Sequence, residues 1–297
     1  MKTQNNALVD GKYALPSHRD VKKLKYNWQK CLPILLGDLF TRVTEYGIER
    51  YDTYKLADHL VDFIRELNDS HGGHNVYTVS VIMGKRDAED NSHFYLNSPS
   101  NNIFIPILEI VLHKAQYGHK VYYFYLEPMN KQFSLSYSNR SQYGDKKNDY
   151  PSTLEEDISP KVAELFIVKW QSIGDTELIE AFDCLAPKNT LDVPSHYLHS
   201  DETLFTQQKL LRVIQYNFDA LETKAIFKRM DYYGEVNFYI NLGAGLSVSD
   251  YHPFSFRPII TIEKKHGGRN SEDDIPPTTY FDTSRPCPPF CKPEEEC

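Results

Sequence analysis

The stretch His119-Lys-Val-Tyr-Tyr-Phe-Tyr-Leu126, Glu127-Pro-Met-Asn130, Gln132-Phe-Ser-Leu-Ser-Tyr137 carries the clearest β-hairpin pattern in the chain. Its first arm is apolar on both faces from Val121 to Leu126, which predicts a strand inside a sheet. Its return arm alternates apolar and polar residues, which predicts a half-buried strand with one face in water. The apolar members of that arm are Phe133, Leu135 and Tyr137. An antiparallel sheet is therefore expected at this point of the fold.

Hydrophobic spacing predicts helices and strands on both sides of this hairpin. Ser159 followed by Pro160 is a typical helix start, with serine as the cap and proline in the first turn. Residues 177–185 fit a helix or a strand, and the pattern leaves both open. The mixture predicts an α+β fold, in which a helical N-terminal segment and long helices pack on a mostly antiparallel mixed sheet. The predicted helices cover 20–46 (interrupted at Pro33 and Gly37), 51–67, 101–117, 160–173 and 200–230, and the predicted strands cover 76–83, 236–242, 246–249 and 258–265.

Composition divides the chain into a body and a tail. Residues 1–265 are expected to form one α+β body, with a helical part over 1–73 and a mixed part over 74–265. Residues 266–297 contain six prolines, seven acidic residues and three of the five cysteines, a composition that predicts a disordered tail. Neither an internal repeat nor a coiled-coil heptad pattern is visible in the sequence.

The distribution of charge argues against a large nucleic-acid interface. The net charge is −8, and the body is close to balanced, whereas a nucleic-acid footprint needs a strongly basic face. Two local clusters of cations are compatible with a basic patch or with an ordinary solvated surface. They comprise Lys22, Lys23 and Lys25 near the N-terminus, and Lys264, Lys265 and Arg269 before the tail.

The sequence predicts a soluble, cytoplasmic protein with no transmembrane segment. Its N-terminus lacks the apolar core of a signal peptide, and its longest apolar runs, 31–36 and 103–108, are too short to span a bilayer. The terminal Cys297 does not complete a prenylation box, which needs the cysteine four residues from the end. An odd number of cysteines fits a reducing compartment, where Cys31 and Cys184 are expected as buried thiols.

One short motif suggests metal-dependent chemistry. Asp250 precedes the apolar strand 259–262, and Glu263 and Lys265 follow it. This arrangement resembles the metal site of the PD-(D/E)xK nuclease superfamily, which implies that two carboxylates hold Mg²⁺ and a lysine steadies the attacking water or the phosphate. The superfamily usually continues into a helix and a strand, whereas this chain enters its predicted tail. A strand end with solvated charges is the alternative.

Two histidine pairs have a spacing that can hold a metal on a helix turn. The first pair encloses two glycines and the second lies beside Pro194, so both are expected in loops, and no zincin glutamate accompanies either. Gly243-Ala-Gly245 is expected to be a hairpin turn and not a phosphate cradle. The weak metal candidates are His71, His74, His196 and His199.

These patterns favour a binding or assembly protein over an enzyme. No P-loop, dinucleotide fingerprint, nucleophile elbow or kinase motif is present, and no cofactor is expected. The leading hypothesis is a soluble intracellular protein that binds a protein partner or assembles with itself through tyrosine-rich surfaces, with the cysteine-bearing flexible tail used for attachment or regulation. Its alternatives are an Mg²⁺-dependent nuclease and a membrane-acting protein tethered through acylated cysteines. The attachment candidates are Cys287, Cys291 and Cys297.

Overall fold

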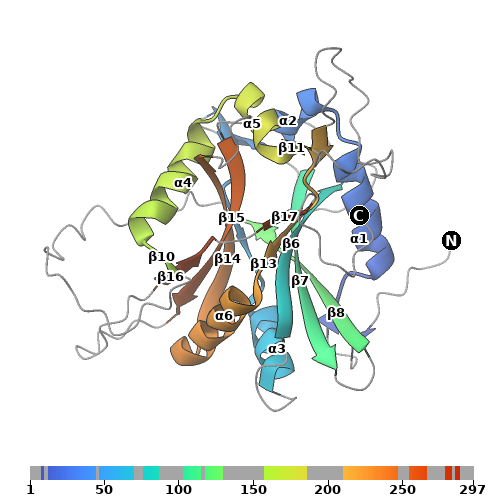
Figure 1. The fold of residues 1–297 in the computed structure, drawn as a ribbon, viewed down its shortest axis with the longest axis vertical. Helices are drawn as coiled ribbons and strands as arrows, with labels where there is room; N and C mark the ends of the chain where they lie inside the picture. The colour runs from blue at the N-terminus through green and yellow to red at the C-terminus, as the bar shows by residue number, and fades with distance from the viewer. Residues whose placement is uncertain are drawn as a thin grey trace, which may run out of the picture.

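The fold is α+β, as expected, and every strand pairing in its described part is antiparallel. A computed structural model describes residues 8–9, 13–44, 47–69, 76–86, 103–114, 118–129, 157–185, 210–246, 254–265, 278–282 and 285–287. Two large sheets face each other across an apolar core (Figure 1).

The first large sheet has five strands and the second has six. In spatial order the five-stranded sheet contains β17 (Arg285–Cys287), β13 (Gln215–Phe218), β6 (Val76–Arg86), β7 (Ile103–Lys114) and β8 (Gly118–Tyr125). The six-stranded sheet contains β10 (Asp157–Ile158), β16 (Thr278–Phe281), β15 (Phe254–Lys264), β14 (Val236–Leu246), β5 (Thr53–Lys55) and β9 (Glu127–Pro128). Small two-stranded sheets are formed by β1 (Leu8–Val9) with β2 (Tyr13–Ala14), β3 (Thr41–Thr44) with β4 (Gly47–Arg50), and β11 (Asp183–Leu185) with β12 (Leu210–Arg212).

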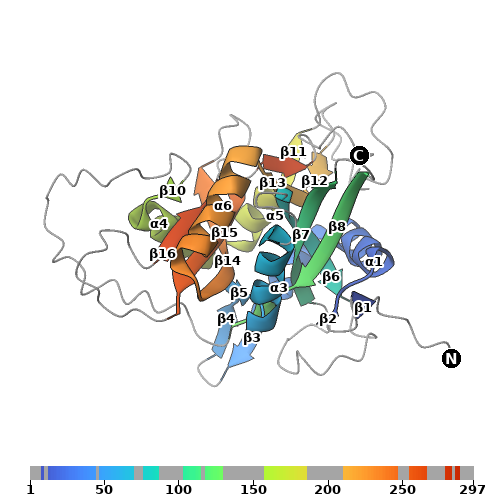
Figure 2. The same ribbon diagram turned by 90° about the horizontal axis from the view of Figure 1, so that it is seen from below.

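The helices cover the outer sides and close the ends of this two-sheet core. α1 (His18–Gln29) lies outside the five-stranded sheet, and α4 (Pro160–Ser172) lies outside the six-stranded sheet on the opposite side of the molecule (Figure 1). α3 (Asp58–Asp69) and α6 (Ala220–Tyr233) lie side by side at one end (Figure 2). The short helices η1 (Pro33–Leu35), α2 (Leu36–Leu39) and α5 (Asp175–Phe182) close the other end.

The order of elements repeats once along the chain, although no repeat was visible in the sequence. α1, α2, β3–β4, β5, α3, β6, β7 and β8 are followed in the same order by α4, α5, β11–β12, β13, α6, β14, β15 and β16. Each half also exchanges one strand, because β5 pairs with β14 of the second half and β13 pairs with β6 of the first. The described structure is thus an internal duplication whose halves are interlocked.

Two glycines at equivalent positions have matching neighbours in the two halves. A Cβ on Gly84 would lie 2.8 Å from Ile105 O, 3.3 Å from Ile107 Cδ1 and 3.3 Å from Leu24 Cβ of α1. A Cβ on Gly243 would meet the matching atoms of the second half: Arg257 O at 3.0 Å, Ile259 Cδ1 at 2.9 Å and Phe166 Cβ of α4 at 3.1 Å. In both halves a glycine lets the outer helix approach the sheet closely.

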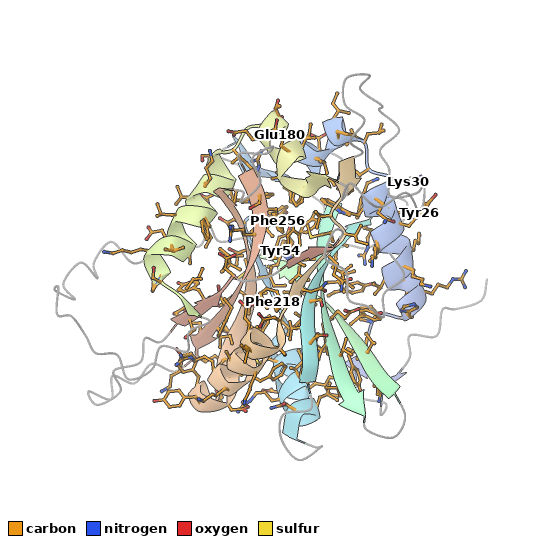
Figure 3. All side chains as sticks on the ribbon, viewed as in Figure 1. Tyr26, Lys30, Tyr54, Glu180, Phe218 and Phe256 are labelled. Atoms are coloured by element: carbon orange, nitrogen blue, oxygen red, sulfur yellow. The ribbon has the colours of Figure 1, made fainter. Side chains whose placement is uncertain are left out.

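The aromatic core follows the same duplication. Trp28 packs edge-on against Phe182 at 5.1 Å, and Trp170 packs edge-on against Phe40 at 5.0 Å. Phe40 and Phe182 stack on each other with ring centres 5.5 Å apart and planes inclined by 5°. These four rings are fully buried or nearly so and join the two halves at the centre of the molecule. Figure 3 shows the neighbouring Tyr54 and Phe256 in the same interior.

Each indole also binds the backbone of the other half. Trp28 Nε1 donates to Val213 O at 2.7 Å, and Trp170 Nε1 donates to Tyr51 O at 2.9 Å. An arginine lies over each indole: Arg212 over Trp28 at 5.6 Å and Arg50 over Trp170 at 5.7 Å. These equivalent contacts cross between the halves, so each half completes the core of the other.

The predicted helix over 101–117 is wrong, because this run forms β7. The run is apolar without alternation since Phe104 and Leu108 face the main core while Ile105 and Ile107 pack under α1. Pro106 is tolerated because its partner Met83 donates its amide to Ile214 on the far side of β6, and the pairing of β7 with β8 begins at Ile107.

The predicted long helix over 200–230 is also wrong in its first part. Residues 210–212 and 215–218 form β12 and β13, and α6 begins only after Asp219, whose side chain accepts a hydrogen bond from the Glu222 amide. Pairing with β6 and β17 overrides the helical spacing of Leu210, Leu211 and Ile214. Similarly, the helical part predicted over 1–73 contains α1 and α3 but also the strands β3, β4 and β5.

Gly243-Ala-Gly245 is not a turn, and the predicted tail is not free of structure. The glycines lie inside β14, where each pairs with β15 beneath α4.

β16 and β17 both fall after residue 265, and Tyr280 and Phe281 are buried at positions equivalent to Tyr123 and Phe124. The body therefore extends at least to β17, and the rest of the predicted tail lies outside the described residues.

Several local predictions are confirmed. Ser159 caps α4 by accepting from the Val162 amide, and α4 ends before Gly174. β6 covers the strand predicted over 76–83 and continues through Gly84, while residues 177–185 supply the end of α5 and then β11. The first arm of the quoted hairpin forms β8 with Phe124 fully buried. In the described part, however, β8 stands at the end of the sheet order, and the return arm lies outside the described residues.

Candidate functional site

The two described residues of the nuclease hypothesis, Glu263 and Lys265, contact other side chains of the protein. Glu263 on β15 accepts hydrogen bonds from Asn237 Nδ2 at 3.3 Å and from the Tyr239 hydroxyl at 3.1 Å. Lys265 Nζ lies 3.1 Å from Asp58 Oδ2, and Lys55 Nζ lies 2.9 Å from Asp58 Oδ1. Asp250 lies outside the described residues. Glu263 near the end of β15 and Lys265 just after it are two residues apart, but they contact different groups.

The charged and polar side chains at this end of the sheet are paired with one another. Burial, together with the neighbouring Glu263 carboxylate, raises the pKa of Tyr239, so its hydroxyl stays protonated and remains a donor. The hydrogen bond from Lys55 lowers the pKa of Asp58, with a further contribution from Lys265. Within the described residues no three His, Cys, Asp or Glu side chains are grouped so as to hold a metal ion.

Most of the remaining site residues predicted from the sequence lie outside the part of the chain that the structure describes. His71, His74, His196, His199, Cys291 and Cys297 lie outside the described residues. Cys287 lies on β17 opposite Gln215 of β13, so its backbone belongs to the five-stranded sheet. Cys31 is a buried free thiol, as expected. None of the helices in the described part of the chain is long and apolar enough to cross a membrane.

A buried polar row in the five-stranded sheet was not anticipated. Asn217, Ser80, Glu109 and Tyr123 occupy successive strands in one register. Ser80 Oγ donates to Asn217 Oδ1 at 2.9 Å, while Gln215 Nε2 donates to Asn217 Oδ1 at 2.8 Å and to Glu109 Oε1 at 3.3 Å. These five side chains are at most 7% exposed, which closes them to a substrate and suits them to fixing strand register. Ser80 and Glu109 interrupt apolar runs, and that was the signal available in the sequence.

A second buried carboxyl ties β16 to β15 beneath α4. Asp282 is 4% exposed, and its Oδ2 lies 3.3 Å from Arg257 Nη1. Burial raises the pKa of Asp282 to about 6 despite the favourable charge of Arg257. Because the folded-state pKa exceeds the unfolded one, the protonated carboxyl stabilises the fold at low pH, and this contribution is lost as the pH rises through about 6.

Asp282→Asn is expected to remove this pH dependence. Relative to the variant, the wild type should lose about 2–3 kcal/mol of unfolding free energy between pH 4 and pH 7. Urea melts of both proteins across this range measure the difference. Asp62→Asn, which changes an exposed carboxyl on α3, serves as the control and should not reproduce the effect. Parallel profiles for wild type and Asp282→Asn would contradict the assignment.

The most distinctive surface among the described elements is an apolar stripe on α4. Val162, Leu165 and Val168 are 38%, 66% and 47% exposed and follow one another at successive turns of the outward face. The opposite face of α4 buries Ala163, Ile167 and Trp170 against the six-stranded sheet. Isolated exposed apolar residues are ordinary, whereas a contiguous row on one helix face is typical of an interaction site.

α4 is held rigidly at both ends. Ser159 caps its N-terminus, and Arg50 Nη1 donates to Trp170 O at 3.2 Å and to Ile173 O at 2.8 Å at its C-terminus. Phe166, in the middle of α4, packs closely against Gly243 of β14, and this contact fixes the middle of the helix on the sheet. The stripe is therefore presented on a preorganised helix.

Comparison with protein-family models, with curated proteins and with solved structures found no match for this chain.

Proposed function

We propose that this chain is a protein-binding protein whose partner docks on the α4 stripe, Val162, Leu165 and Val168. The observation that carries this proposal is the internal duplication, because it supplies a control for what the fold itself requires. α1 occupies the same place in the first half as α4 in the second. At the first two stripe positions it carries the charged residues Asp20 and Lys23, and only the third position holds an exposed aromatic residue, Tyr26. An apolar outer face is thus not a requirement of the architecture.

The geometry of the stripe fits an apolar ridge on a partner protein. Three aliphatic side chains at successive helix turns form a row that can pack against the apolar face of a helix. Because α4 is already held by Ser159, Arg50 and Phe166, little ordering of this side is needed on binding, which favours affinity. The flanking Lys161 and Gln171 provide an exposed polar rim.

Leu165→Asp is expected to weaken partner binding at least tenfold, because it places a charge in the middle of an apolar contact. A photo-crosslinking residue at Val168 would first identify the partner, and titration of that purified partner by calorimetry would then give both affinities. Leu221→Asp is the matched control, since Leu221 on α6 is exposed to the same extent as Leu165. Equal losses for both variants, or unchanged affinity for Leu165→Asp, would contradict the proposal.

The nuclease hypothesis has no comparable observation in its favour. Its two described residues, Glu263 and Lys265, are engaged with Tyr239, Asn237 and Asp58. Nuclease assays with Mg²⁺ and with Mn²⁺, repeated on Glu263→Ala, test it directly.

A further inference from the structure

The outward face of α1 is a row of cations with one aromatic residue. Val21, Leu24 and Trp28 bury the opposite face of this helix. The only acidic residue of α1, Asp20, lies to one side, where it completes a capping box with Ser17. The outward residues follow helical spacing, so they share one face, and they are Arg19, Lys22, Lys23, Tyr26 and Lys30. Figure 3 shows Tyr26 and Lys30 on the outer side of the molecule.

An aliphatic tip follows directly at the C-terminal end of this helix. Leu32 is 55% exposed and Ile34 is 82% exposed, the largest exposure among the large hydrophobic residues of the described structure. Cys31 before the tip and Leu36 after it are buried, so the chain is anchored on both sides while Leu32 and Ile34 project. Pro33 lies between them at the start of η1 and restricts the backbone there.

The second half of the chain again provides the comparison. The positions in α4 and α5 that are equivalent to Lys22, Tyr26 and Lys30 hold Glu164, Val168 and Ser172. Those equivalent to Leu32 and Ile34 hold Gly174 and Thr176. Neither the basic face nor the aliphatic tip is therefore demanded by the fold, and the two features occur together in one half.

We propose that the α1 face and the Leu32–Ile34 tip dock this protein on an anionic lipid surface. Lysine and arginine side chains are attracted to the negative headgroups, while an aliphatic tip and a tyrosine partition into the interface below them. A nucleic-acid backbone would satisfy the cations but offers no apolar environment to Leu32 and Ile34. The net charge of −8 does not oppose this, because acidic groups more than about 10 Å from the surface are screened by salt.

Vesicle co-sedimentation of the full, unacylated chain tests the proposal. Binding to phosphatidylcholine vesicles that contain phosphatidylserine should exceed binding to phosphatidylcholine alone and should fall as salt is raised. Each cation removed should weaken binding about fivefold, so Lys22→Gln with Lys30→Gln should cost about 25-fold. Ile34→Asp should weaken vesicle binding at least tenfold, because the aliphatic tip would no longer be buried in the lipid interface. Lys224→Gln with Lys228→Gln, at two exposed positions on α6, is the matched control and should change nothing.

Several outcomes would overturn the proposal. They are equal binding to neutral vesicles, equal losses for the α1 and α6 variants, and binding of duplex DNA by the α1 face without binding of vesicles. Circular dichroism of each variant establishes that it is folded. Leu165→Asp should leave vesicle binding unchanged, so this surface and the α4 stripe are tested separately.

Discussion

Trp170→Ala is expected to lower the free energy of unfolding by about 3–5 kcal/mol, because it removes a fully buried indole and leaves a cavity. The ring contacts Phe40, Phe182 and Phe256 with centres 5.0–6.0 Å apart, so the loss reaches both halves. It also leaves Tyr51 O without the donor at 2.9 Å. Trp28→Ala should cost a similar amount, since Trp28 makes the equivalent contacts.

Urea melts of both alanine variants provide the measurement. Trp170→Phe keeps most of the packing but removes the N–H donor, so it should cost about 1–3 kcal/mol and remain folded if the alanine variant does not. A cost below about 1 kcal/mol for either alanine variant would show that the four-ring centre does not join the halves.

Separation of the chain between residues 130 and 156 is expected to leave two fragments that fold only together. The N-terminal fragment lacks β13, which supplies the neighbour of β6, and the C-terminal fragment lacks β5, which supplies the neighbour of β14. Each fragment would expose an unpaired strand and half of the aromatic core, which favours aggregation or disorder. The mixed fragments should regain the circular dichroism spectrum and a cooperative melt.

Size-exclusion chromatography of the separate and mixed fragments distinguishes the outcomes. A fragment that melts cooperatively as a monomer would contradict the interlocked architecture. As a control, cleavage of the intact folded protein in the same region should leave the halves associated, because β5 and β13 are already exchanged.

The sequence predicted those elements whose signals are local. Ser159 and Pro160 predicted the start of α4, and the helical spacing of Leu60, Ile64 and Leu67 predicted α3. The β-branched run after Val76 predicted β6. These signals depend on capping, helical spacing and strand propensity, which act between residues that are close in the chain.

The elements that were missed depend on partners far away in the sequence. β7 is apolar on both faces only because α1 and the core cover it, and an unbroken apolar run cannot separate strand from helix. Gly243 and Gly245 imitate a turn, although they serve the approach of α4. β5 and β13 are short, and pairing with the opposite half defines them. β16 was obscured by the prolines and acidic residues on both sides of Tyr280 and Phe281.

The duplication left a faint trace that could have been found. Ser17, Trp28-Gln29 and Phe40 recur with the same spacing as Ser159, Trp170-Gln171 and Phe182. Most of the other equivalent positions hold different residues, which makes the repeat hard to detect from the sequence. The α4 stripe and the Leu32–Ile34 tip were beyond prediction for a related reason, since exposure of an apolar residue depends on how its helix is seated.

The exchange of β5 and β13 also sets the order in which the protein can fold on the ribosome. After the first half has been synthesised, the edge of β6 has no partner until residues 215–218 emerge. β5 likewise waits for β14. Pairings between such distant segments make folding slow, and the waiting edges attract other chains. Production of the protein should therefore benefit from added chaperones that cover these edges, and most of its loss should occur before the second half is complete.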